Sequence, residues 1–69
     1  MEIIKLKDDH IKLGQALKAA RLAASGVEAK LFILDGKVKV NGTVCLQRGK
    51  KLFDGDTVDF EGKTIKIRK

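Results

Sequence analysis

The chain has 69 residues, which suits one small domain, because proteins divide into separate hydrophobic cores only at several times this length. Cys45 is the only cysteine and His10 the only histidine, so an internal disulfide is excluded and the four ligands of a structural zinc site are not at hand. No apolar run approaches the roughly 20 residues of a membrane span, and residues 1–7 lack the apolar stretch of a signal peptide. We therefore expect a single cytoplasmic domain over residues 1–69 that holds no cofactor.

The net charge of the chain is +6, from 15 Lys and Arg against nine Asp and Glu. The excess lies in the second half, because residues 37–69 carry nine bases and four acids. Within it, the segment from Lys37 to Lys51 holds five bases and no acid, so one surface region should be strongly positive. Such a region favours a polyanionic partner, with an ordinary solvated surface as the alternative.

The first elements that the sequence predicts are a strand and a helix. Glu2–Leu6 alternates as a short strand, which we expect at the edge of a sheet. A helix is predicted over Asp9–Leu22, with Asp8 or Asp9 as its N-cap and Gly14 as a weak point. Its apolar stripe at helical spacing consists of Leu13, Ala16, Leu17, Ala20 and Ala24.

A second helix is predicted over Ser25–Asp35. Ser25 and Glu28 fit a capping box, in which the serine oxygen accepts from the amide three residues on and the glutamate reaches back to the serine amide. Gly36 can adopt the left-handed conformation that closes a helix. The expected core face of this helix consists of Ala29, Phe32 and Ile33.

From residue 37 the apolar period changes to two, which predicts strands. Val38 and Val40 point inward, and Asn41-Gly42 predicts a tight hairpin turn before a returning strand at residues 43–45. Two further strands follow, around residues 58–60 and 65–67. The predicted class is α+β, with two short helices packed on a small, mostly antiparallel sheet. We expect the remaining aromatic residues and the cysteine in the interior: Phe53, Phe60 and Cys45.

Four short motifs resemble, in order and spacing, the RNA-binding domain named after small-subunit ribosomal protein S4, also called the alpha-L domain. They are Leu-Gly-Gln-Ala-Leu-Lys at 13–18, Ser-Gly-Val-Glu-Ala-Lys at 25–30, Gly-Lys-Val-Lys-Val-Asn-Gly at 36–42 and Gly-Asp-Thr-Val at 55–58. The chain is most similar to the small free-standing bacterial members of this family. The resemblance implies the family's fold and an RNA ligand that lies along the two helices and the start of the hairpin.

Seven basic positions match the family's RNA contacts: Lys12, Lys30, Lys37, Lys39, Arg48, Lys50 and Lys51. The last five are also the bases of the acid-free segment that charge alone singles out. Lysines on the outer face of a hairpin are ordinarily just solvated, and Lys30 fits either a phosphate contact near a helix N-terminus or a solvated side chain. Asn41 fits a turn residue better than a reader of bases.

The residues do not favour catalysis or metal binding. His10 and Cys45 lack a third group to orient them, and the acids around residues 54–61 lack the spacing of a calcium loop. Gly62-Lys63-Thr64 is followed by a strand pattern rather than by the helix of a phosphate-binding loop. We expect a non-catalytic, monomeric RNA-binding module without a membrane or small-molecule partner. The expected ligand is ribosomal RNA or a ribosome-assembly intermediate, followed by transfer RNA. The alternative function is a protein-interaction module that binds an acidic partner.

Overall fold

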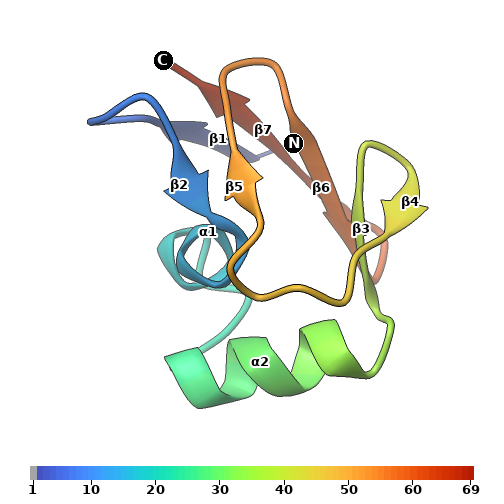
Figure 1. Cartoon of the computed structure of the whole chain (residues 1–69). Helices are drawn as coiled ribbons and strands as arrows, with labels where there is room; N and C mark the ends of the chain where they lie inside the picture. Colours follow the sequence, from blue (N-terminus) through green and yellow to red (C-terminus); the bar gives the residue numbers. More distant parts are fainter. Residues whose placement is uncertain (1) are drawn as a thin grey trace.

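A computed structural model describes residues 2–69 of the chain (Figure 1). It contains two helices, α1 (Leu13–Ala19) and α2 (Gly26–Leu34). The strands are β1 (Glu2–Lys5), β2 (Ile11–Lys12), β3 (Val38–Val40), β4 (Thr43–Val44), β5 (Lys51–Leu52), β6 (Thr57–Phe60) and β7 (Lys63–Arg68). No helix within this described part is long and apolar enough to cross a membrane.

The strands form a five-stranded sheet in the order β1-β7-β6-β3-β4 and a two-stranded sheet of β2 and β5. Strands β3, β4, β6 and β7 pair antiparallel, whereas β1 runs parallel to β7 at the edge. The predicted α+β class, the mostly antiparallel sheet and the edge position of the first strand are therefore confirmed. Figure 1 shows β2 and β5 side by side next to α1, in front of the larger sheet.

The hydrophobic core lies between the helices and one face of the five-stranded sheet. Alternation along the strands buries one residue in two, and α2 reaches this face through Phe32, whose ring centre is 4.8 Å from that of Phe60. The largest fully buried side chains are Leu13, Leu17, Ile33, Val38, Leu52, Val58, Ile65 and Ile67. The expectation that Phe53 is buried is wrong: it is 47% exposed, because Leu52 of β5 occupies the inward position beside it.

The prediction of a helix over Asp9–Leu22 is correct only for its middle, because α1 begins at Leu13 and ends at Ala19. Residues Ile11 and Lys12 form β2 instead, which pairs with Leu52 and Lys51 of β5. The predicted N-cap at Asp8 or Asp9 is wrong for the same reason, since pairing with a distant strand holds the preceding backbone extended. The prediction that Ala24 belongs to the apolar stripe of this helix is also wrong, because Ala24 is exposed and its neighbour Ala23 is buried.

The second helix follows the sequence closely. Ser25 is the N-cap of α2, and its Oγ accepts a hydrogen bond from the Glu28 amide at 3.2 Å. The Glu28 carboxylate reaches back to the amide of Ala24, one residue before the serine amide that the capping box predicts. At the other end Gly36 has φ +75°, and the amides of Gly36 and Lys37 donate to the carbonyls of Ile33 and Phe32, which is a Schellman motif.

The predicted hairpin turn is present between β3 and β4. Asn41 and Gly42 have φ of 51° and 84°, as a type I′ turn requires. Both polar atoms of the Asn41 side chain have partners within the fold, because its Oδ1 accepts from the Thr57 amide at 2.9 Å and its Nδ2 donates to Asp56 at 3.1 Å. Asn41 therefore serves as a turn residue that ties the hairpin to the start of β6.

We predict that Gly42→Val lowers the melting temperature, because a β-branched residue at positive φ is strained by about 1–3 kcal/mol. Gly49→Val is the matched control, since Gly49 lacks a positive φ and no atom lies within 4 Å of a Cβ placed there. Thermal unfolding followed by circular dichroism checks both variants. A loss of several degrees is expected for Gly42→Val alone, and equal losses would contradict the assignment of strain to the turn.

Candidate functional site

The loop between β4 and β5 is attached by backbone hydrogen bonds to the start of α1. The amides of Leu13 and Gly14, the first two residues of the helix, donate to the carbonyls of Lys50 at 2.8 Å and Arg48 at 3.1 Å. Such amides have no partner inside a helix, so the loop supplies what a capping side chain ordinarily supplies. The segment from Arg48 to Lys50 is thereby fixed against α1.

Gly14 allows this close approach. A Cβ placed on Gly14 would lie 2.8 Å from Cγ of Arg48, which is shorter than a real contact. The bare backbone of Gly14 therefore leaves room for the stem of the Arg48 side chain, although the glycine is unfavourable within the helix. What looks like a weak point of the helix in the sequence is a requirement of the loop that packs against it.

A groove opens where α1, the N-terminus of α2 and this loop meet. We call it the basic groove; its volume is about 310 Å³, and it is lined by Lys12, Gly14, Gln15, Lys18, Gly26, Arg48 and Gly49. Three of these side chains are cationic and none is acidic, and Gly26 and Gly49 have no side chain to cover the backbone. Gly26 is the first residue of α2, so the positive end of that helix dipole faces the same place. The arrangement is suited to an anion.

Lys12, which lines the basic groove, also belongs to a pair of like charges. Lys12 of β2 and Lys51 of β5 are directly opposite each other in the two-stranded sheet. Both are exposed, and neither forms an ion pair with any residue from 2 to 69. Like charges in this relation destabilise a strand pair, and a bound anion would remove the repulsion.

The structure brings together part of the predicted set of basic residues. Lys12 and Arg48 line the basic groove, Lys51 faces Lys12, and Lys30 lies one helical turn beyond Gly26 on α2. The sequence analysis missed Lys18, which lines the groove from α1. The available signal was its spacing of four residues from Gly14 and three from Gln15 on the same helix face.

The other predicted contacts lie elsewhere. Lys50 lines a neighbouring hollow beside the β3–β4 hairpin. Lys37 forms an ion pair with Glu61 at 3.7 Å. Lys39 lies between the buried Val38 and Val40, so it points to the side of the sheet that faces away from the helices. The acid-free stretch of sequence thus divides among three surfaces.

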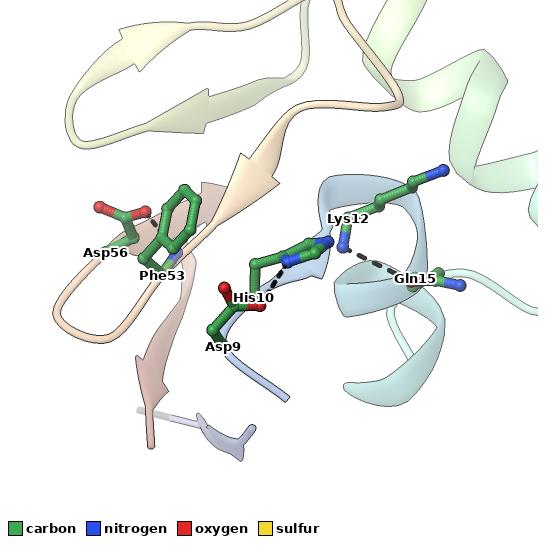
Figure 2. A network of polar contacts seen from close by, with 6 residues as sticks. All are labelled: Asp9, His10, Lys12, Gln15, Phe53 and Asp56. Carbon is green, nitrogen blue, oxygen red and sulfur yellow. Dashed lines mark hydrogen bonds and ion pairs between the residues drawn. The ribbon is translucent and has the colours of Figure 1, made fainter. Parts of the chain in front are cut away.

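His10 and Cys45 take part in separate interactions. Figure 2 shows His10 pointing to Asp9, with 2.8 Å between Nδ1 and Oδ1, and this hydrogen bond lowers the pKa of the Asp9 carboxyl. The His10 ring lies 5.9 Å from that of Phe53, whose amide donates to Asp56 (Figure 2). Cys45 is half-buried against the core as predicted, and its Sγ contacts the carbonyl of Gln47 at 3.7 Å. Figure 2 also places Lys12 beside Gln15, whose Oε1 is 3.5 Å from the Lys12 amide.

Comparison with known proteins gives a solved relative that covers the whole chain. The solution structure of YbcJ from Escherichia coli superimposes with a TM-score of 0.77 and 34% identity, over 100% of this chain and 89% of that one. That structure is described as revealing an alpha-L motif involved in RNA binding. In sequence, YbcJ is 36% identical over 61 residues, which is 88% of this chain and 87% of the relative.

Two further relatives are matched over very different shares of their own length. RlbA of Bacillus subtilis, named as a probable ribosome maturation protein, is 42% identical over 59 residues, which cover 86% of this chain and 83% of RlbA. An uncharacterized RNA pseudouridine synthase of Aquifex aeolicus is 42% identical over 48 residues, which cover 70% of this chain and only 20% of the enzyme. The family described as the S4 domain matches residues 4–68, so the resemblance found in the sequence is confirmed. The chain is an RNA-binding domain of the S4, or alpha-L, family.

Proposed function

We propose that the protein binds structured ribosomal RNA, or an intermediate of ribosome assembly, in the basic groove. The observation that carries this proposal is the groove itself, where Lys12, Lys18 and Arg48 surround the N-terminus of α2 without an acid in the lining. Phosphate is the anion that such a combination of cations and free helix amides favours. The ribosome maturation name of RlbA supports the choice of ribosomal RNA over transfer RNA, and a cytoplasmic location is part of the same proposal.

The proposed contacts recognise the shape of the RNA backbone more than its sequence. The groove offers lysines, an arginine and glycine backbone, which position phosphates without reading bases. No aromatic ring lines it, so bases have no stacking platform there. The side-chain amide of Asn41, which could read a base edge, is held in the fold by hydrogen bonds to Asp56 and Thr57.

The rival is a protein-interaction module, and one observation favours it. Val27, Leu31 and Leu34 form an exposed apolar stripe along α2. A protein partner on this stripe would be insensitive to competing RNA, whereas RNA in the basic groove would show a steep dependence on salt. We propose no catalytic role, and the match to the pseudouridine synthase is confined to a fifth of that enzyme.

We predict that Lys12→Ala and Lys51→Ala each lower the slope of log affinity against log salt by about 0.7–0.9, because each lysine that neutralises a phosphate releases counterions. Affinity should fall similarly for unrelated RNA sequences. The melting temperature should stay equal or rise, since either change removes the repulsion between the two opposed lysines. Titrations with a structured ribosomal RNA fragment at several salt concentrations measure the slopes.

Lys63→Ala is the control for these variants, because Lys63 is exposed on β7 and lies outside the groove lining. It should leave both affinity and slope near wild type. Equal slopes for wild type, Lys12→Ala and Lys51→Ala would move the RNA away from the groove.

We predict that Gly14→Ala weakens RNA binding roughly tenfold, because a Cβ there displaces the Arg48 stem, and a hydrogen bond to a charged group contributes about 1.5 kcal/mol. Alanine is the better helix former, so a loss of folding does not explain such an effect if the melting temperature is maintained. In an Arg48→Ala background, Gly14→Ala should have no further effect on affinity. Additive losses in this double-mutant cycle would show that Gly14 does not act through Arg48.

A further inference from the structure

The face of the five-stranded sheet that points away from the helices carries its own positive charge. Along each strand these residues alternate with buried ones, so they share one surface. We call this surface the outer sheet face; it consists of Ile3, Lys5, Lys39, Val44, Thr57, Asp59, Thr64, Lys66 and Arg68. Four of these nine residues are cations and one is an acid, so the face holds half of the net charge of +6.

Two of its cations are directly opposed. Lys5 of β1 and Arg68 of β7 are partners in the parallel register, and both are exposed. Neither forms an ion pair with any residue that the structure describes. Like charges placed opposite each other destabilise a sheet, so this pair reduces the stability of the free protein until an anion lies across it.

The single acid of the face does not neutralise its neighbour. Lys39 is the register partner of Asp59, yet the Asp59 carboxylate accepts a hydrogen bond from the Thr64 hydroxyl at 2.7 Å and makes no ion pair with Lys39. Lys66 is held by a neutral group, because its Nζ donates to the carbonyl of Gly55 at 3.1 Å. None of the four cations of the face forms an ion pair with a described residue, so the excess of positive charge extends from β1 across to β3.

The outer sheet face lies on the opposite side of the sheet from the basic groove. The helices and the loop that form the groove are on the side of the sheet that carries the buried residues. An anion bound in the groove therefore does not cover the cations of the outer sheet face.

We propose that the outer sheet face binds the phosphate backbone of a second RNA segment, so that one molecule bridges two RNA strands. This inference rests on the proposed RNA binding in the groove. A protein partner fits the face less well, because protein interfaces need an apolar centre, and only Ile3 and Val44 supply exposed apolar area here. Phosphate contacts need only the cations, which lie on β1, β7 and β3.

A sandwich assay tests the bridge. A short RNA hairpin is immobilised at low density, the full chain is captured on it, and an identical fluorescent hairpin is then added. Lys5→Glu places a carboxylate opposite Arg68, which turns a repulsive pair into an attractive one. Lys63→Glu is the matched control, because it makes the same change of charge on β7 outside both surfaces.

Wild type and Lys63→Glu should retain the fluorescent hairpin, whereas Lys5→Glu should lose at least tenfold of that signal. Lys5→Glu should still be captured by the first hairpin, with a melting temperature equal to or above that of wild type, which excludes misfolding as the cause. An undiminished sandwich with Lys5→Glu would overturn the proposal. If the first hairpin captures the wild-type protein but the fluorescent hairpin is not retained, the second RNA contact is overturned and binding in the groove stands. If the first hairpin captures no protein, binding in the groove is overturned as well.

Discussion

The contact between the start of α1 and the loop before β5 is the interaction on which the functional architecture depends. Two helix amides that need an external partner find it in the carbonyls of Arg48 and Lys50. The same contact extends into the pairing of β2 with β5, which sets where the helix begins. These backbone hydrogen bonds thus cap the start of α1, fix the loop from Arg48 to Lys50 and form one wall of the basic groove.

The residues that carry the family resemblance stabilise the fold more than they bind a ligand. Asn41 and Thr57 are joined by hydrogen bonds between two of the motifs, and Asp56 joins the same cluster. Gly36 and Gly42 adopt the positive φ values that their turns require. These residues explain why the S4 domain is recognisable from sequence.

Two pairs of positively charged side chains face each other across the sheets and reduce the stability of the fold through their repulsion. Lys12 faces Lys51 across one sheet, and Lys5 faces Arg68 across the other. Each pair would be more stable with an acid on one side. A protein selected only for stability gains nothing from two such pairs, whereas a protein that binds a polyanion recovers the cost when phosphate lies between the charges.

The sequence by itself determined the features that depend on neighbouring residues. The capping box of α2, the glycine that ends it and the Asn41-Gly42 turn are local, so their residue types specify them directly. The alternation of apolar and polar residues predicted the strands from residue 38 onward and their buried face. The acid-free segment predicted a negatively charged ligand. The motifs gave the family, because their spacing spans nearly the whole chain.

Only the tertiary structure decided what depends on residues far apart in the chain. Ile11 and Lys12 read as helix, yet pairing with β5 about forty residues later makes them a strand. The five bases between Lys37 and Lys51 form one cluster in the sequence, but a strand, a turn and a loop direct them to different surfaces. Lys18 joins Arg48 in the groove only because Gly14 lets the loop approach α1. Composition fixes how much charge a chain carries, and packing fixes which charges meet.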